Sequence, residues 1–347
     1  MPQVTVEALR AFSNDIFTAL DVSTEDAATI TDVMIHADLR GHASHGTTRI
    51  PIYAERIKAG IVKNRPDIRF SRINPGFIRV DGNNGPGPVV TLAALEELLT
   101  VVRETGVAIA AIGHSNHNGT GSYYVERAIA AGCIAIAMTN APPSMAVFGG
   151  REPVIGTNPI TFGAPTTSES PRLLDMATLV VARGKIVEAA KRGEPIPEGW
   201  ALNGTGRPTT DSGEAEAGVV LPMSGSKGSG LAIMVEVLSG VLSGGRFAGS
   251  LGNLYSDFET PQDIGHFLML IDVSRDNFAD RAGMLVAELK ASATAEGFKE
   301  ILTPGEIEQQ RAHDKTAIAL PPNVLFDLNQ TAAGLGLEPL STMELAS

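Results

Sequence analysis

The sequence predicts an α/β protein, in which strands buried inside a sheet alternate with helices. Two continuous apolar runs, residues 107–112 and 133–138, are typical of strands that are covered on both faces. Between them, the glycine-containing residues 119–121 open a stretch with a helical pattern. The 43% hydrophobic content and 37 glycines are ordinary for a globular α/β chain, and 347 residues suffice for roughly two domains.

Residues 1–75 are predicted to form a helical N-terminal subdomain. Apolar side chains recur at helical spacing, and Ser23 is a suitable N-cap for the second helix. We expect this subdomain to pack with the C-terminal segment 310–347, which contains a short helix. The three helical patterns of the subdomain cover residues 6–20, 24–39 and 50–60.

Residues 76–309 are predicted to form a mixed α/β region. Residues 194–218 are dense in Pro, Gly, Thr and Asp, and we expect a loop there, at a functional site or a subunit contact, with Trp200 as a packing anchor. Further strands are predicted at 77–81, 173–178 and 267–273, and further helices at 92–102, 231–242 and 279–297.

Composition and charge exclude several classes of partner. The chain has 27 Lys and Arg against 39 Asp and Glu, a net charge of −12, which argues against nucleic-acid or membrane partners but allows a small anionic substrate. We find no signal peptide and no apolar run of the ~18 residues that a membrane-spanning helix needs. The single Cys133 lies in an apolar run and fits a reducing compartment, so we expect a cytoplasmic protein.

Polar residues gather at the ends of the two buried strands. His114 and His117 follow the first strand, and Asn140 follows the second. Ligands of α/β proteins collect at strand ends, and the backbone N–H groups of residues 119–121, at a helix start, could hold a phosphate. We therefore expect the cofactor and the reacting centre within residues 113–158.

A second polar group, Ser44, His45 and Arg49, follows the second predicted helix. A histidine can donate or accept a proton near neutral pH, and Ser44 could orient it or relay the proton. The guanidinium of Arg49 could bind a substrate carboxylate. The alternatives are a polar loop for Ser44 and His45 and a surface ion pair for Arg49.

Two glycine motifs bear on phosphate binding. Lys227 stands in a glycine-rich turn at a helix start, which suits a phosphate, although the P-loop order is absent. No GxGxxG follows a strand, so the dinucleotide fingerprint of Rossmann folds is missing. The residues alone thus indicate an α/β enzyme with an anion-binding, histidine-containing site.

Two other classes of protein stay open on these residues. His42-x-x-His45 and His114-x-x-His117 have the spacing of metal ligands, but no Cys pair or HExxH supports a zinc site, and we expect none. A non-catalytic binding protein is the other alternative. The co-occurrence of acid/base and anion-binding residues argues against it.

Nine blocks of sequence, in order, resemble the malate/L-lactate dehydrogenase family. This family also contains ureidoglycolate, sulfolactate and diketogulonate dehydrogenases and piperideine/pyrroline-2-carboxylate reductases. The resemblance covers roughly residues 5 to 335. The blocks are ADLRGHASHGTTRIPIY, SNHNGTGSYY, AMTNAPP, GTNPITFGAP, LDMATLVVARGK, IPEGWALN, PTTD, GSKGSGLAIMVE and PGEIE.

The resemblance implies a non-Rossmann, mixed-sheet NAD(P)-binding fold like that of sulfolactate dehydrogenase, which accounts for the missing fingerprint. It also implies a homodimer with composite active sites. The expected cofactor is NAD or NADP, and we favour NAD. The expected reaction is hydride transfer between nicotinamide and a small 2-hydroxy acid or 2-oxo acid. The alternative is NADPH-dependent reduction of a cyclic imino acid.

The same resemblance implies a role for each matching residue. His45 would be the acid/base, Ser44 its hydrogen-bonded neighbour, and His117 a second histidine that some members use as the base. Arg49 would bind the substrate carboxylate, and the substrate pocket would also include Thr157, Arg183 and Gly184. The cofactor-contacting positions would be His117, Asn118, Gly119, Thr120, Gly121, Asn140, Asp175, Met176, Ala177, Lys227, Pro304, Gly305 and Glu306.

Two positions depart from the family pattern. Asn118 stands where an aromatic residue is common, and His114 stands where a small polar residue or Asn is common. These departures bear on the identity of the substrate rather than on the type of reaction.

Overall fold

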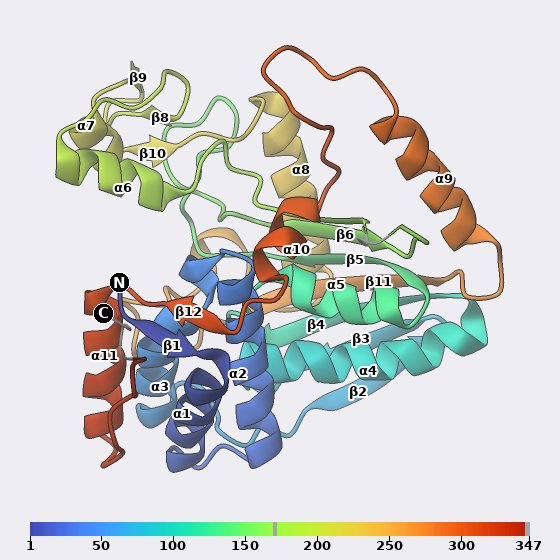
Figure 1. Ribbon diagram of the computed structural model, residues 1–347. Helices are drawn as coiled ribbons and strands as arrows, with labels where there is room; N and C mark the ends of the chain where they lie inside the picture. Colours follow the sequence, from blue (N-terminus) through green and yellow to red (C-terminus); the bar gives the residue numbers. More distant parts are fainter. Residues whose placement is uncertain (169–171, 344–347) are drawn as a thin grey trace.

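A mixed sheet of seven strands forms the centre of the protein in a computed structural model, which describes residues 1–168 and 172–343 (Figure 1). Strands β3 and β4 pair in parallel, and every other neighbouring pair is antiparallel. Rossmann sheets are mostly parallel, so the predicted non-Rossmann mixed sheet is confirmed. The strands, in spatial order, are β2 (Arg69–Asn74), β3 (Phe77–Asp81), β4 (Val107–Ser115), β11 (Ile264–Asp272), β5 (Cys133–Thr139), β6 (Ile160–Ala164) and β7 (Arg172–Met176).

The central strand β11 brings the ends of β4 and β5 together. Both strands run antiparallel to β11, so their C-terminal ends lie at the same edge of the sheet. At this edge Ile264 pairs with Ser115, and His266 pairs with Thr139. The segments after these two strands, which carry His117 and Asn140, therefore leave the sheet side by side.

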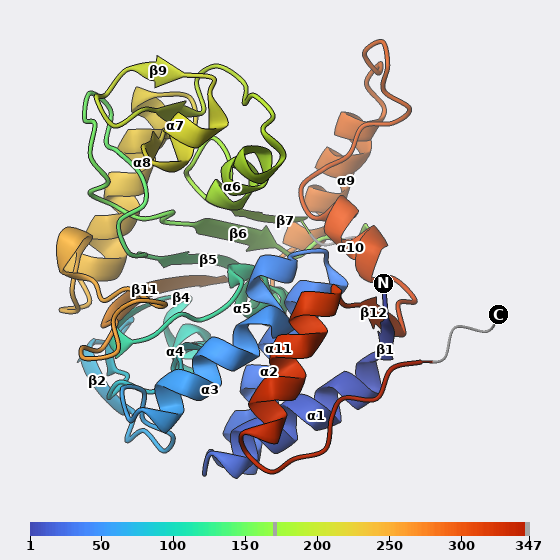
Figure 2. The same ribbon diagram turned by 90° about the vertical axis from the view of Figure 1, so that its left-hand side faces the viewer.

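Helices cover both faces of the sheet. Helices α4 (Gly87–Thr105) and α5 (Gly121–Ala130) lie on one face, and α8 (Ser226–Glu236) lies on the other (Figures 1 and 2). The chain after α8 widens into a π-helical turn, Val237–Val241, that packs against β11. The core under α4 and α5 is apolar and includes Val80, Leu98 and Ala110.

The N-terminal helices and the C-terminal segment share one apolar core. Strand β1 (Gln3–Thr5) pairs with β12 (Ala317–Ala319), and Leu328 of the last helix is buried in the cluster that contains Leu9 and Ile50. Ser23 accepts the predicted cap hydrogen bond, from the Asp26 N–H at 3.1 Å. The helices of this part are α1 (Val6–Ala19), α2 (Thr24–Leu39), α3 (Ile50–Lys58) and α11 (Pro322–Ala333).

We keep the division of the chain into a helical and an α/β part as a proposal. Strand β2 pairs with β3 in the large sheet, so the α/β part begins a few residues before the predicted boundary at residue 75. Residues 344–347 of the predicted C-terminal segment lie outside the described residues.

A small lobe replaces the loop that was predicted at 194–218. The prediction missed two strands of two residues and a helix of five residues, which are too short to show a periodic pattern, whereas residues 194–200 and 203–207 are irregular. The lobe surrounds a buried cluster that includes Ile186, Ala201 and Val220. Its elements are α6 (Arg183–Arg192), β8 (Ala201–Leu202), β9 (Pro208–Thr209), α7 (Ser212–Glu216) and β10 (Val219–Val220).

The remaining helices lie along one side of the molecule (Figure 2). Helix α9 (Phe278–Lys290) ends earlier than the predicted residue 297, and α10 (Glu306–Ala312) follows after a connecting segment. Within the described ranges, none of the helices combines the length and the apolar character that crossing a membrane requires.

Candidate active site

The turn after α2 holds Ser44, His45 and Arg49 in a fixed conformation. The carboxylate of Asp38, near the end of α2, accepts hydrogen bonds from the Thr47 N–H at 2.9 Å and from its hydroxyl at 2.7 Å. Burial raises the pKa of Asp38 to about 6, although the bonds from Thr47 act to lower it. The Thr47 anchor ties the whole turn to the end of the helix.

Within this turn the predicted acid/base residues contact each other. The Ser44 hydroxyl lies 2.9 Å from Nδ1 of His45, and Nε of Arg49 donates to the Ser44 carbonyl at 2.6 Å. Burial, and then the charges of Arg49 and His42, lower the pKa of His45 to about 4. The imidazole of His45 is therefore neutral near pH 7 in the protein alone.

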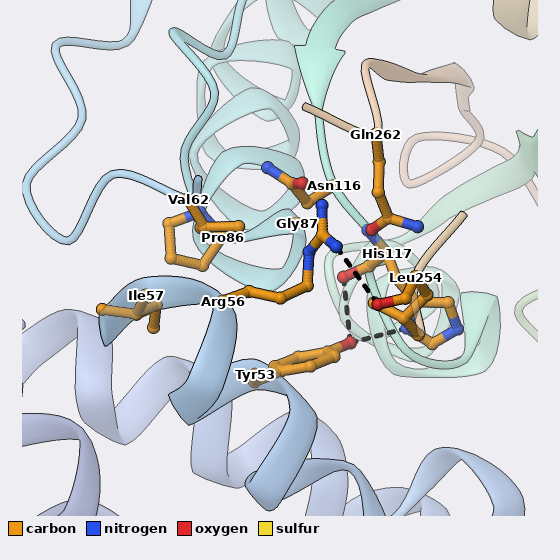
Figure 3. A pocket seen from close by; sticks show the side chains of 10 residues that line it. All are labelled: Tyr53, Arg56, Ile57, Val62, Pro86, Gly87, Asn116, His117, Leu254 and Gln262. Atoms are coloured by element: carbon orange, nitrogen blue, oxygen red, sulfur yellow. Dashed lines mark hydrogen bonds between the residues drawn. The ribbon is translucent and has the colours of Figure 1, made fainter. Parts of the chain in front are cut away.

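His117 is held at the end of β4 by groups from three segments (Figure 3). The Tyr53 hydroxyl lies 2.6 Å from Nδ1 of His117 and 3.0 Å from its carbonyl oxygen, and Gln262 accepts the His117 N–H at 3.2 Å. The Gly119 N–H donates to the same Nδ1 at 3.4 Å, which indicates that a neutral ring carries its proton on Nε2. Burial, and then the charges of Arg49 and His45, hold the pKa of His117 well below its usual value.

We call Ser44, His45, Arg49 and His117 the histidine–arginine cluster. The ring centroids of the two histidines are 5.4 Å apart. The guanidinium of Arg49 lies 5.2 Å from the ring centroid of Tyr255, and its Nη1 is buried without a hydrogen-bond partner. An unpaired buried donor is costly, so this atom points to an anionic ligand. The cluster can bind a carboxylate next to a group that exchanges a proton.

A buried arginine organises the loop that supplies Tyr255 and Gln262. Arg56 is 1% exposed, and its Nη1 donates to the carbonyls of Leu254 at 3.1 Å and Asp257 at 2.6 Å (Figure 3). The sequence did not reveal these supporting residues. The available signal was Tyr53, which lies four residues after Arg49 and therefore on the same side of the helix.

The loop at the start of α5 packs closely against neighbouring segments. Gly119 has φ of +78°, and a Cβ there would lie 2.3 Å from Val33, so only glycine fits. The Asn118 amide donates to Thr91 at 3.2 Å, and the Thr120 hydroxyl is buried without a partner. The unpaired hydroxyl of Thr120 could donate to the predicted cofactor, whereas the N–H groups of Gly119 and Ser122 are bonded within the protein.

The predicted cofactor residue Asp175 lies next to this helix start. Its carboxylate accepts the Ser122 N–H at 2.8 Å and the Thr161 hydroxyl at 3.0 Å. A pocket of about 210 Å³ lies beside it and is lined by Asp175, Pro304, Gly305, Arg40, Glu126 and Glu308, among others. The structure thus brings three predicted cofactor positions together and adds charged residues that the sequence did not single out.

Other predicted positions make no direct bond to the histidine pair. Among the described residues, no hydrogen bond joins Thr157, Arg183 or Lys227 to His45 or His117. Arg183 and Gly184 stand at the exposed start of α6, and Lys227 stands at the exposed start of α8. Met176 and Ala177 follow Asp175 at the end of β7. These roles remain predictions.

Two predicted cofactor residues use their side chains within the protein. The amide of Asn140 bonds to Glu236, to the Arg246 carbonyl and to the Gly265 N–H. Glu306 pairs with Arg172 and Lys290. Burial acts to raise the pKa of Glu306, but Lys290 and Thr303 lower it below its usual value. Both residues could contact a cofactor only through their backbone.

The alternative of a metal site receives no support. Within residues 1–168 and 172–343, no three His, Cys, Asp or Glu side chains gather in a way that could hold a metal ion. His114 instead pairs with Asp263, whose carboxylate lies 2.9 Å from Nδ1 of the histidine.

Comparisons with known proteins show the family to which the chain belongs. The family described as malate/L-lactate dehydrogenase matches residues 4–329. A malate dehydrogenase of Pyrococcus horikoshii is 36% identical over 97% of both chains. A ureidoglycolate dehydrogenase (NAD⁺) of Escherichia coli O157:H7 is 36% identical over 83% of this chain and 84% of its own, and a (2R)-3-sulfolactate dehydrogenase (NADP⁺) of Chromohalobacter salexigens is 37% identical over 73% and 76%.

Solved structures show the same fold. Sulfolactate dehydrogenase of Methanocaldococcus jannaschii superposes with a TM-score of 0.91 at 35% identity, covering 96% of this chain and 98% of its own. A Δ1-piperideine-2-carboxylate reductase of Pseudomonas syringae superposes with a TM-score of 0.85 at 30% identity, covering 96% and 100%. The protein is therefore an NAD(P)-dependent dehydrogenase of 2-hydroxy acids. It belongs to the malate/L-lactate dehydrogenase family.

Proposed function

We propose that this protein interconverts a small 2-oxo acid and its 2-hydroxy acid, of the malate or lactate type, with His45 as the acid/base. The observation that carries the proposal is the buried, unpaired Nη1 of Arg49 beside two imidazoles 5.4 Å apart. A carboxylate bound at Arg49 would place the adjacent carbonyl between the histidines. NAD(P)H, when bound, supplies the hydride for the carbonyl carbon.

The residues of the cluster move and position the proton. In reduction, His45 donates a proton to the oxygen that becomes the hydroxyl, and in oxidation it accepts that proton. The charge of Arg49 lowers the pKa of His45, so a carboxylate that neutralises Arg49 raises this pKa again. Substrate binding thereby prepares the acid form. Ser44 orients the ring through Nδ1, and His117 lines the opposite side of the reacting centre.

The charge of the pocket beside Asp175 favours NAD over NADP. Arg40 is already paired with Glu126, through two bonds of 2.7 Å, and Asp175 and Glu308 add negative charge. The 2′-phosphate of NADP would meet more negative than positive charge if the adenosine half occupies this pocket. Kinetics with both cofactors test this preference.

Exposed apolar side chains support a homodimer. Met234 and Val241 on the α8 side are 52% and 54% exposed, and Met284 and Leu285 on α9 are 71% and 57% exposed. Apolar patches of this kind often mark contacts with a second chain. Light scattering on the purified protein measures the oligomeric state.

We also propose that the protein is cytoplasmic, as its single cysteine led us to expect.

A second candidate function is reduction of a cyclic imino acid. The structural relative that is named as a piperideine-2-carboxylate reductase covers almost the whole chain. A cyclic imino acid also carries a carboxylate for Arg49 and a site that a protonated His45 could reach.

A spectrophotometric screen separates these functions. NADH and NADPH would be tested against 2-oxo acids and cyclic imino acids, and the 2-hydroxy acids would be tested in reverse. Oxidation of cofactor by a 2-oxo acid is the expected result. Turnover of cyclic imino acids alone would replace the proposed substrate class, and no turnover together with no cofactor binding would contradict both candidates.

A further inference from the structure

Glu236 is a buried carboxylate that has no cationic partner among the described residues. It is the one charged residue in the apolar stretch 231–242 and is 6% exposed. Its Oε1 accepts hydrogen bonds from the Ala248 N–H at 2.7 Å and from Nδ2 of Asn140 at 3.2 Å. Its Oε2 accepts a hydrogen bond from Nδ2 of Asn158 at 2.6 Å. A buried charge is costly unless its hydrogen bonds are complete, so three donors from three separate segments call for an explanation.

Two of these segments carry or adjoin predicted positions of the proposed site. Asn140 follows β5 and is a predicted cofactor position, and Asn158 is next to Thr157, a predicted substrate position. Both amides also bind backbone groups. Oδ1 of Asn158 accepts the Ala141 N–H at 3.1 Å, and Oδ1 of Asn140 accepts the Gly265 N–H at 2.9 Å. We call Glu236, Asn140, Asn158 and the backbone of Ala248 the Glu236 network.

Two members of the network hold strained backbone. Asn158 has φ of +35° and Ala248 has φ of +49°, and both lie in the region that glycine prefers. Such conformations persist only where the surroundings enforce them, and both residues donate directly to Glu236. The carboxylate is thus the common anchor of both strained positions.

The helix that carries Glu236 is itself distorted at this point. The π-helical turn Val237–Val241 begins at the next residue, and a Cβ at Gly265 would lie 1.8 Å from the Ser239 carbonyl. The helix therefore approaches the backbone of β11 more closely than any side chain there would allow. π-Helical turns occur often at functional sites, where they direct a side chain.

We propose that Glu236 is a positioning residue that holds the substrate-side backbone at Thr157 in register with the cofactor-side backbone at residues 140–141. The Thr157 carbonyl also accepts the N–H and the hydroxyl of Thr178, at 3.0 and 2.9 Å, so its segment is held from both ends. This inference rests on the proposed function, because the roles of Thr157 and Asn140 come from it.

The variant Glu236→Gln tests one contact of the network. The Gln Oε1 can still accept from Ala248 and Asn140, whereas its NH₂ group would face the NH₂ group of Asn158. We expect kcat/KM for the 2-oxo acid to fall about 10- to 100-fold, as for a lost hydrogen bond to a charged group. The Kd for NADH should stay within about twofold, because the Asn140 contact remains.

A second substitution restores the contact in reverse. In Glu236→Gln with Asn158→Asp, the Gln NH₂ group would donate to the new carboxylate, which also keeps the bond from the Ala141 N–H but loses the bond from the Asn158 amide to the Ala232 carbonyl. We expect kcat/KM to recover about tenfold and Asn158→Asp alone to be impaired, because it opposes two carboxylates. Glu97→Gln, on the exposed face of α4, is the matched control and should behave as the parent protein.

Amide hydrogen exchange reads out the network without turnover. The Ala141 N–H should exchange faster in Glu236→Gln and regain protection in the double variant. Parent-like kinetics and exchange in Glu236→Gln would overturn the proposal. Absence of turnover in the parent protein would contradict the proposed function, whereas the exchange pattern would still decide the role of Glu236.

Discussion

The histidine–arginine cluster and the Glu236 network both gather polar side chains beside the same sheet edge, yet they differ in how their hydrogen bonds are used. Every polar atom of the Asn140 and Asn158 amides has a partner inside the protein. The cluster instead leaves Nη1 of Arg49 unpaired and keeps both histidines neutral.

This difference separates framework from reacting centre. A fully bonded network has one low-energy arrangement, so it is suited to fix backbone. A cluster with an unpaired donor and low pKa values has free energy that a ligand can recover, so it is suited to bind and react. Substitutions in the cluster should therefore change catalysis with little loss of stability, whereas substitutions in the framework should lower stability and should change catalysis only through the backbone that the framework positions.

The largest effect is expected for His45→Ala. Removal of the acid/base should lower kcat by ~10²–10⁴-fold, whereas the Kd for NADH should change little. Steady-state kinetics and NADH fluorescence measure the two quantities. Unchanged turnover would move the proton role to His117.

The pH dependence of stability probes the framework. Burial lowers the pKa of His266 to about 3, while Nδ1 and Nε2 of its ring lie 2.8 Å from the hydroxyl of Thr139 and 3.0 Å from that of Ser115. Between pH 6.5 and this value the unfolded chain binds a proton at His266 and the native protein does not, so stability falls as pH falls. The full contribution is present above pH 6.5.

A single substitution isolates this contribution. Asp38, whose pKa is raised to about 6, acts in the opposite direction between pH 4 and 6 and partly masks the histidine in the parent protein. The slope of unfolding free energy against pH should therefore be compared between the parent and His266→Gln. We expect the variant to lack about 1.4 kcal/mol per pH unit of this slope, measured by urea unfolding. Equal slopes would show that His266 is protonated in the native protein.

The next effect concerns Arg49→Lys. Lysine keeps the positive charge that lowers the pKa of His45 but cannot bind a carboxylate through two parallel bonds. We expect KM for the 2-oxo acid to rise about 10- to 100-fold, with little change in the apparent pKa of the reaction. An unchanged KM would mean that another residue binds the carboxylate.

The histidine–arginine cluster could be predicted from the sequence, whereas the Glu236 network could not. Ser44, His45 and Arg49 lie within six residues, so local pattern and family resemblance reveal them together. Glu236 stood out only as a charge in an apolar helix, because its partners lie 78 and 96 residues away and meet it only in the folded sheet.

The fold prediction also succeeded only where the sequence pattern of an element is long enough to be recognised. The long buried strands β4 and β5 and the helix α4 have strong patterns and were predicted. The strands of the lobe around Ala201 have two residues each, and strands that short show no alternating pattern.

The smallest effect, and the one that tests the boundary between the two regions, is expected for Tyr53→Phe. Tyr53 is buried like a framework residue, but its hydroxyl contacts Nδ1 of His117 at 2.6 Å. Loss of one neutral hydrogen bond should lower kcat about tenfold, with KM and stability nearly unchanged.

The chain offers a matched control in Tyr255→Phe. This substitution keeps the ring beside Arg49 and removes only a hydroxyl, and it should leave kcat within about twofold. If Tyr53→Phe instead lowers Tm and leaves kcat unchanged, Tyr53 belongs to the framework, and His117 is held in its tautomer by Gly119 alone. If both substitutions lower kcat equally, the hydroxyl of Tyr255 also reaches the reacting centre.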